Sequence, residues 1–386
     1  MLKKHYSQFL QHHQGQQHYA CHSHHFWPDV TRQAQLDYWD DSARLADEKW
    51  QYFFTDKVPA AQRHIAAILN LPAPEQLAFA PNTHEFVVRL FSCLPTGRRA
   101  RVLTTDSEFH SFTRQSRRLA EAGLIELTVV PTLPLASFEQ RFAEQAATGG
   151  WDMVFCSQVF FNSGFAITDM PALVAAVPDP ETLIVIDGYH GFCAIPTDLS
   201  AIAGRVFYLA GSYKYAQGGE GCCFLAVPPG CQLKPRNTGW YAEFGALEAG
   251  RSEQVAFAEG GQRFAGATFD FTALYRLLAV MAWWQRDGIS VEAIHHHVQQ
   301  LQQHFLAELE ATGCQQLQRC QLLANDLQHH GHFLTFALED ADTTAALARF
   351  LRDQGILTDY RDNRLRFGFA PYMELADIDL SALAGR

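Results

Sequence analysis

The chain has 386 residues, of which 48% are hydrophobic and 18% charged, so it can bury a large core. Its formal net charge of -11 at pH 7 argues against a nucleic-acid backbone or an anionic membrane surface as the main partner, because both attract basic patches. No uninterrupted apolar run is long enough to span a bilayer. We expect a soluble globular protein with no nucleic-acid and no membrane partner.

The nine cysteines are odd in number and scattered, and no CxxC pair occurs, which suits reduced thiols rather than a disulfide framework. The N-terminal stretch MLKKHYSQFLQHHQGQQHY lacks the apolar segment of a signal peptide, so we expect a cytoplasmic location. Neither the histidine-rich run from His12 to His25 nor the triplet at 295–297 has zinc-ligand spacing, and we expect no metal site. The triplet is expected on the solvated face of a helix.

Seven short apolar runs between about residues 75 and 230 alternate with amphipathic helical stretches. Their near-continuous Val, Ile, Leu and Phe content is typical of strands buried on both faces of a parallel sheet that helices cover. The expected strands span residues 77–80, 101–105, 127–130, 152–157, 182–187, 206–211 and 222–227. The sequence therefore predicts an α/β fold with a mainly parallel sheet flanked by helices.

The pattern changes after residue 230. Strand-like runs at 332–338 and 364–370 enclose a helical stretch at 343–355, which predicts a smaller α+β domain. The expected organisation has three parts. They are an N-terminal arm packed on the small domain (1–50), a large α/β domain that holds the site (51–260) and a small C-terminal α+β domain (261–386).

Polar or aromatic residues follow five of the expected strands, where ligands bind in open parallel sheets. They are Asn82 with Thr83, Phe109 in SEFHSF, Ser157, Asp187 with His190, and Lys214 in AGSYKYAQGGEG. Lys214 lies 27 positions after Asp187, enough for one crossover to a neighbouring parallel strand. The acid and the amine can therefore face the same crevice.

A buried carboxylate and a lysine at strand ends are the smallest set of side chains that a pyridoxal-phosphate site requires. The lysine forms the Schiff base, and the acid keeps the pyridine nitrogen protonated. A structural Asp–Lys ion pair is the alternative. Asn82 or Thr83 can cap a helix in which Glu85 completes a capping-box spacing, which leaves backbone N–H groups for a phosphate. Phe109 offers a ring to stack on the pyridine, although such a ring also serves as plain core.

Four segments carry a resemblance to a known family: IDGYHGFCAIPTDL, GSYKYAQGGEGCCFL, NTGWYAEFG and RLRFGFAPY. They resemble the fold-type-I pyridoxal-phosphate enzymes of the class V aminotransferase superfamily, and within it most closely kynureninase. Their order and approximate spacing agree from about residue 75 to the C-terminus. In cysteine desulfurases of this superfamily the Schiff-base lysine typically follows a histidine, whereas here it follows Tyr213, as in kynureninases.

The resemblance implies a role for each candidate residue. Lys214 is implied as the Schiff base and proton carrier, Asp187 as the partner of the pyridine nitrogen and Tyr213 as a candidate acid. The implied cofactor contacts are Asn82, Thr83, Phe109 stacked on the ring, Ser157, His190 beside the ring and Tyr213. Trp240 and Thr268 are implied to reach the phosphate from the second subunit of a homodimer with shared active sites.

The substrate end of the resemblance is less complete. Arg366 is implied to bind the substrate α-carboxylate, and the stretch His24–Trp27, with His25, is expected to line an aromatic pocket unless it is a packed arm. The chain has CHSHHFWPD where kynureninases have a Gly-Asn-Ser-Leu-Gly-like stretch, FFNSG for Asn-Tyr-Arg-Thr-Gly, and Phe269 where a proline is expected. The cofactor match is therefore closer than the substrate match.

The implied activity is kynureninase-like hydrolysis of the Cβ–Cγ bond of an amino acid, from kynurenine to anthranilate and alanine, as in tryptophan catabolism. A class V aminotransferase, or a lyase or desulfurase acting on a different amino acid, is the alternative within the superfamily. A non-catalytic family member is a further alternative from another class.

Overall fold

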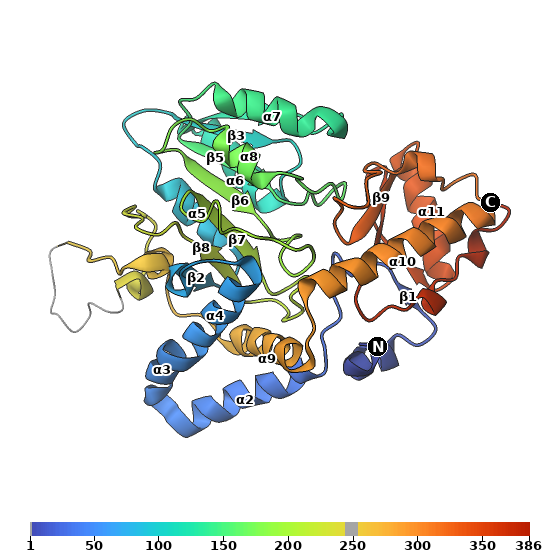
Figure 1. The fold of residues 1–386 in the computed structure, drawn as a ribbon, viewed down its shortest axis with the longest axis horizontal. Coiled ribbons are helices and arrows are strands. Elements are labelled where there is room, and N and C mark those ends of the chain that lie inside the picture. Colours follow the sequence, from blue (N-terminus) through green and yellow to red (C-terminus); the bar gives the residue numbers. More distant parts are fainter. Residues whose placement is uncertain (1, 244–253) are drawn as a thin grey trace.

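One seven-stranded sheet organises the larger part of the molecule (Figure 1). The computed structural model describes residues 2–243 and 254–386. The strands are β2 (Leu77–Ala80), β3 (Ala100–Thr105), β4 (Ile125–Val130), β5 (Met153–Ser157), β6 (Leu183–Asp187), β7 (Val206–Gly211) and β8 (Cys223–Ala226). Their order is β2-β8-β7-β6-β5-β3-β4, and all are parallel except β8, which is antiparallel to both neighbours. The predicted α/β fold and its strands are confirmed.

Helices cover both faces of this sheet, as the apolar character of its strands requires. The alternation along β6 shows why: Leu183 and Val185 pack with the buried residues of one face, and Ile184 and Ile186 with those of the other. The first face is covered by α5 (Thr83–Ser92) and α6 (His110–Glu121). The second is covered by α4 (Val58–Leu69), α7 (Phe138–Ala147), α8 (Met170–Ala175) and α9 (Thr272–Asp287).

A second, smaller part lies beside the sheet and contains the C-terminus (Figure 1). Its three-stranded antiparallel sheet has the order β11 (Asp359–Arg361), β12 (Arg364–Gly368) and β9 (Phe333–Ala337). The helices of this part are α10 (Val291–Thr312) and α11 (Ala341–Asp353). The expected strand–helix–strand order of the small domain is thus present.

The first fifty residues contact both parts of the molecule. After α1 (Ser7–His12), strand β1 (Gln17–His18) pairs in parallel with β10 (Ile356–Leu357) of the smaller part. Helix α2 (Val30–Leu45) instead packs along α9, and α3 (Lys49–Tyr52) leads into α4. The segment between β1 and α2 therefore passes between the two sheets.

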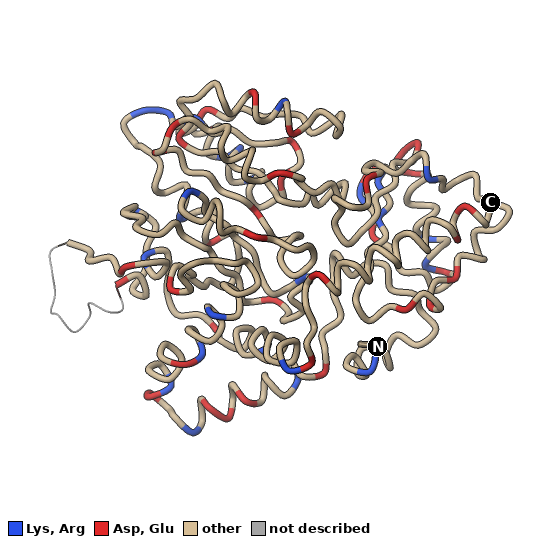
Figure 2. The backbone as a smooth tube through the Cα atoms, in the orientation of Figure 1, with Lys and Arg blue, Asp and Glu red and all other residues tan. Residues whose placement is uncertain are grey.

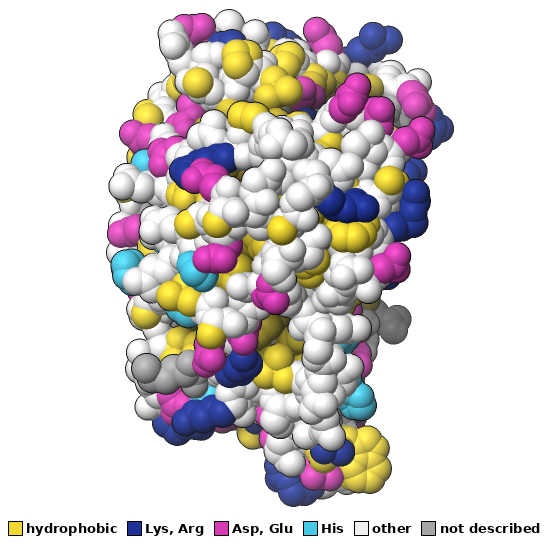
Figure 3. Space-filling view, turned by 90° about the vertical axis from the view of Figure 1, so that its right-hand side faces the viewer, with side chains coloured by type: hydrophobic (Ala, Val, Ile, Leu, Met, Phe, Trp, Pro, Cys, Tyr) yellow, Lys and Arg dark blue, Asp and Glu magenta, His cyan; other side chains and the backbone are white. Residues whose placement is uncertain are grey.

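Charge is distributed without a dominant basic region. Figure 2 shows Lys and Arg interspersed with Asp and Glu along the backbone. On the face shown in Figure 3, charged side chains of both signs lie between separate apolar patches. Among the described helices, none combines the length and the apolar composition that crossing a membrane needs.

The histidine triplet at 295–297 differs from its expected position. His295 Nδ1 lies 3.1 Å from His332 Nε2, and the two rings stack, while His297 Nε2 donates to the Met373 carbonyl at 2.8 Å. Only His296 is exposed. The prediction of a solvated face was wrong for two of the three residues, because α10 packs against other segments along two sides.

Gly188 allows a close contact directly after Asp187. A Cβ at this position would lie 2.0 Å from the hydroxyl of Tyr208, which is fully buried and donates to Gln158 Oε1 at 2.8 Å. We expect Gly188→Ala to lower the free energy of unfolding by about 1–3 kcal/mol, because overpacked cores must shift. Denaturant unfolding measures this. Gly204→Ala is the control, since its Cβ meets nothing within 4 Å, and equal midpoints for the two variants would contradict the expectation.

Candidate active site

A pocket of about 440 Å³ opens where the parallel strands end. It collects most of the residues that the sequence singled out, from separate strand ends. Its lining consists of Asn82, Thr83, His84, Phe109, Ser111, Ser157, Phe161, Asp187, Tyr189, His190, Tyr213 and Lys214. The sequence analysis did not single out four of these lining residues, namely His84, Ser111, Phe161 and Tyr189.

Asp187 and Lys214 are the carboxyl group and the amine of the pocket. Asp187 ends β6, its Oδ1 accepts from the Tyr189 amide at 2.9 Å, and burial raises its pKa to about 6. Lys214 follows β7, and burial together with the charge of Arg366 lowers its pKa to about 7. Near neutral pH the site therefore holds a carboxylate and an amine of which a large fraction is uncharged and nucleophilic.

The turn around Lys214 is fixed by backbone and serine contacts. The Ser212 amide donates to the Cys222 carbonyl at 2.8 Å, and its hydroxyl donates to the Gly219 carbonyl at 2.6 Å. Gly219 adopts φ +70°, a conformation that glycine tolerates best. The glycine-rich segment thus folds back on the strand end and holds the lysine toward the pocket.

The start of α5 lies at one end of the pocket. Asn82 is the N-cap, and its Oδ1 accepts from the Glu85 amide at 3.1 Å. The first N–H groups of a helix have no partner within it, and the helix dipole favours a negative charge there. The predicted cap is present, but the Glu85 side chain pairs with Arg89 rather than completing a capping box.

Aromatic rings form one side of the pocket. Phe109 precedes α6 and remains 42% exposed although it is apolar, and it meets Phe161 edge to face at 5.6 Å. His190 is buried, and burial followed by the charge of Lys214 holds its pKa well below the usual value. The ring of His190 is therefore neutral, and Phe109 presents an uncovered flat surface to the pocket.

Glu108 is a functional candidate that the sequence analysis missed. Its carboxyl group accepts from Ser157 Oγ at 2.5 Å and from Thr105 Oγ1 at 2.7 Å, and burial raises its pKa to about 8. These contacts fix the Ser157 side chain at the end of β5. The only sequence signal was an acid directly before Phe109, and it gave no hint of burial.

Arg366 lies on β12 beside the pocket rather than among its lining residues. It is buried, pairs with Asp359 through Nη2 and donates from Nη1 to the Phe161 carbonyl at 2.6 Å. Its Nε is buried and has no hydrogen-bond partner. His22 Nε2 lies 3.4 Å from Asp359 Oδ2 on the other side of the pair.

The segment before α2 contributes two contacts that sequence reasoning did not assign. Lys214 Nζ donates to the His22 carbonyl at 2.6 Å, and the Tyr213 hydroxyl lies 2.5 Å from His24 Nδ1. His25 is placed differently: it is buried, its Nδ1 donates to the Phe26 carbonyl at 2.7 Å, and it does not line the pocket.

Trp240 and Thr268 also lie outside this pocket. Trp240 Nε1 donates to Thr268 Oγ1 at 3.2 Å, so the two side chains contact each other. Their predicted role in a second subunit's site stays a prediction. Phe244 and Gly245, the end of the NTGWYAEFG segment, lie outside the described residues.

No cysteine lines the pocket, in a chain whose nine cysteines all belong to the described residues. Cys21 is close enough to Lys214 for a charge on its thiol to oppose the lowering of the amine's pKa by burial. Cys21 is fully buried, however, and burial raises the pKa of its own thiol. Within residues 2–243 and 254–386, no group of three or more metal-ligating side chains is assembled. The pocket thus offers an amine, one carboxyl group and two phenols, but no thiolate.

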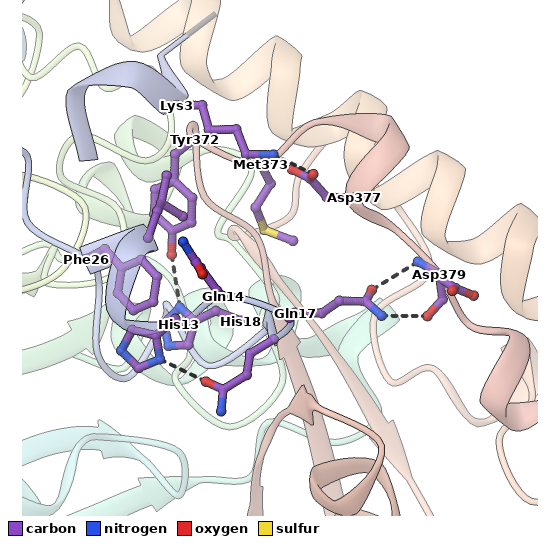
Figure 4. Close-up of a pocket in the computed structure, with 13 residues that line it drawn as sticks. Lys3, His13, Gln14, Gln17, His18, Phe26, Tyr372, Met373, Asp377 and Asp379 are labelled. Atoms are coloured by element: carbon purple, nitrogen blue, oxygen red, sulfur yellow. Dashed lines mark hydrogen bonds and ion pairs between the residues drawn. The ribbon is translucent and has the colours of Figure 1, made fainter. Parts of the chain in front are cut away.

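A second pocket of about 470 Å³ lies between the N-terminal segment and residues 372–379 (Figure 4). Its polar groups pair with each other: His18 Nδ1 with the Tyr372 hydroxyl at 2.9 Å, and Lys3 Nζ with Asp377 at 2.5 Å. Gln17 Nε2 donates to the Asp379 carbonyl at 2.7 Å. Since these groups satisfy one another, we assign the chemistry to the pocket that contains Lys214.

Comparisons with known proteins agree with this architecture. The solved structures that share the fold include a C-DES variant with glycine covalently linked to its PLP cofactor (TM-score 0.80, 17% identity, covering 97% of this chain and 96% of that chain), the cystine C–S lyase C-DES with cysteine persulfide (0.79, 18%, 95% and 96%), and the Escherichia coli cysteine desulfurase CsdA (0.78, 14%, 98% and 96%). No curated protein matches the chain. The family model described as aminotransferase class V matches residues 28–380, and the chain therefore belongs to the class V aminotransferase family.

Proposed function

We propose that this protein is a pyridoxal-phosphate-dependent lyase that eliminates a leaving group from the β-carbon of an α-amino acid. One observation carries the proposal: the pocket joins the Lys214 amine and the Asp187 carboxylate but contains no cysteine. The shared fold with a cystine C–S lyase and with cysteine desulfurases supports chemistry at a carbon–sulfur bond. A soluble amino acid is the proposed substrate class.

The donor groups of the pocket fit pyridoxal phosphate. Lys214 would hold its aldehyde carbon, Asp187 its ring nitrogen, and the N–H groups at the start of α5 its phosphate. Phe109, exposed and flat, would cover the ring, with Ser157 and His190 beside it. When bound, the cofactor supplies an electron sink that stabilises negative charge on a substrate carbon.

Lys214 and Tyr213 are the groups that would move protons. With a pKa of about 7, the Lys214 amine can take a proton from the substrate α-carbon near neutral pH. Burial, together with the charge of Glu220, raises the pKa of Tyr213 to about 12, so its hydroxyl stays protonated and can donate to a leaving group. The two residues are adjacent in sequence and both line the pocket.

Arg366 would orient the substrate through its α-carboxylate. A guanidinium suits this task because its donors are fixed in one plane, and the buried Nε still lacks a partner. The bond between Arg366 Nη1 and the carbonyl of Phe161, a lining residue, holds the guanidinium beside the pocket. Substrate identity would then depend on the side-chain end of the pocket.

The absence of a pocket thiol separates elimination from desulfuration. Transfer of sulfur to the enzyme needs a nucleophilic cysteine near the substrate, whereas elimination releases the sulfur as a thiol or, from cystine, as a persulfide. For cysteine the balance is cysteine plus water giving hydrogen sulfide, pyruvate and ammonia. Elimination thus forms pyruvate, while desulfuration forms alanine.

A kynureninase-like hydrolase is the second candidate. The observation that favours it is the aromatic wall formed by Phe109 and Phe161 together with Tyr213 before Lys214, which suits an aryl substrate. Its products from kynurenine would be anthranilate and alanine. An aminotransferase of the same family would instead need a second substrate, an oxo acid that accepts the amino group, to complete a catalytic cycle.

The products identify the reaction. The protein loaded with pyridoxal phosphate is incubated with L-cystine, L-cysteine or L-kynurenine, and pyruvate, ammonia, alanine and anthranilate are measured. We expect pyruvate and ammonia in equal amounts from the sulfur amino acids. Lys214→Ala should abolish the reaction, and Lys234→Ala, an exposed lysine outside the pocket, should not. Alanine with anthranilate would establish the second candidate instead.

Cofactor capture should depend on pH through Lys214. Below its pKa of about 7 the amine carries a proton and has no lone pair for the cofactor aldehyde. We expect the rate at which the cofactor-free protein develops the visible absorption of lysine-bound cofactor to rise as pH increases through about 7. A rate that falls over this range, or that persists in Lys214→Ala, would contradict the assignment.

Asp187→Asn tests the carboxylate without changing its size. The amide cannot carry the charge that holds the ring nitrogen protonated, so we expect product formation to fall on the order of 100-fold or more. The exposed Asp198→Asn is the matched control and should retain the wild-type rate. Steady-state assays of both variants after saturation with cofactor measure the difference, and equal rates would remove Asp187 from the mechanism.

A further inference from the structure

The N-terminal segment that contains CHSHH crosses the edge of the active site. From it, His24 contacts Tyr213, a residue 189 positions later in the chain. We propose that His24 is a positioning residue that acts through Tyr213: it holds the phenol at the pocket wall and returns to it the proton that Tyr213 gives to the leaving group. This inference rests on the proposed function, in which Tyr213 is the acid.

The geometry places one end of the pair in the pocket and the other in water. The Tyr213 hydroxyl lies 2.5 Å from His24 Nδ1 and 3.4 Å from Nε2, and the rings meet edge to face at 88° with their centroids 5.6 Å apart. Tyr213 lines the pocket, whereas His24 is exposed. The two nitrogens of an imidazole can each accept or donate a proton, so the pair connects the pocket to solvent.

Neighbouring contacts hold His24 in place although it is exposed. On one side, the ring of His22 is buried and stacks on Phe333 with centroids 4.8 Å apart. The backbone carbonyl of His22 accepts from Lys214 Nζ at 2.6 Å. On the other side, Phe26 stacks on Tyr372 with centroids 5.2 Å apart (Figure 4). His24 therefore lies between two anchored residues rather than on a free arm.

Burial, followed by the charge of Glu220, favours a neutral phenol in the resting site, although the Lys214 amine lies nearby. Lys214 Nζ lies 5.9 Å from the centre of the Tyr213 ring, and burial with the charge of Glu220 raises the pKa of Tyr213 to about 12. A phenolate left behind after proton donation is thus a strong base. It needs a proton before the next turnover, and the His24 ring is in contact with its oxygen.

The protons balance over one cycle. The Tyr213 O–H bond breaks as its proton goes to the departing sulfur, and the phenolate oxygen takes a proton from the imidazolium of His24. The imidazole then recovers a proton from water. The net transfer is one solvent proton to the leaving group, with no change in oxidation state.

Four variants of the cofactor-loaded protein test this relay: His24→Ala, His24→Asn, Tyr213→Phe and the His24→Ala/Tyr213→Phe pair. We expect both His24 variants to lower kcat about 100-fold with KM and cofactor affinity unchanged, because an amide can hold the phenol but cannot relay a proton. Added imidazole should restore the kcat of His24→Ala but not that of the double variant. The double variant should be no slower than Tyr213→Phe alone. His12→Asn, an exposed histidine of the same N-terminal region, is the control.

A second readout does not depend on activity. In cofactor-free protein labelled at the tyrosine ζ-carbon, the Tyr213 signal, identified by its absence in Tyr213→Phe, should shift as the imidazole titrates. This inflection should be missing in His24→Asn. A shift that persists in His24→Asn, or a His24→Asn enzyme with wild-type kcat, would overturn the relay. If the relay variants behave as expected but alanine replaces pyruvate, the proposed elimination fails while the His24–Tyr213 relay stands.

Discussion

The structure depends on one constraint: it must bury an amine and a carboxyl group close together at one edge of the sheet. Burial lowers the pKa of Lys214 to about 7 and raises that of Asp187 to about 6, which shows that neither charge is fully compensated in the protein alone. Burying such groups without compensation opposes folding. Gly188, directly after Asp187, leaves room for the buried Tyr208 ring at the same strand end.

Much of the fold follows from sequence because the strands are buried on both faces. Such strands give short continuous apolar runs, and the residues that end them, such as Asp187, must lie along one edge when the strands are parallel. The same reasoning placed Lys214, Ser157 and Phe109 in one crevice, where the structure has them. Their chemical roles do not follow from position, and they rest on the proposed cofactor.

Other parts of the site could not be predicted, because distant segments create them. Glu108 resembles an ordinary loop acid in sequence, and it becomes significant only because Ser157 and Thr105 surround its carboxyl group. The CHSHH stretch departs from the kynureninase pattern, yet it contributes the His22 carbonyl to Lys214 and the His24 ring to Tyr213. Periodicity carries no information about such contacts.

In the proposed site, the charge of Arg366 would couple substrate binding to the base. It lowers the pKa of Lys214, while its own pairing with Asp359 offsets only part of its field. A substrate carboxylate at the guanidinium would add negative charge and cancel more of that effect. The amine would then become more basic when a substrate with an α-carboxylate is present, and less so in an empty site. Substrate selection and proton abstraction would therefore depend on the same ion pair.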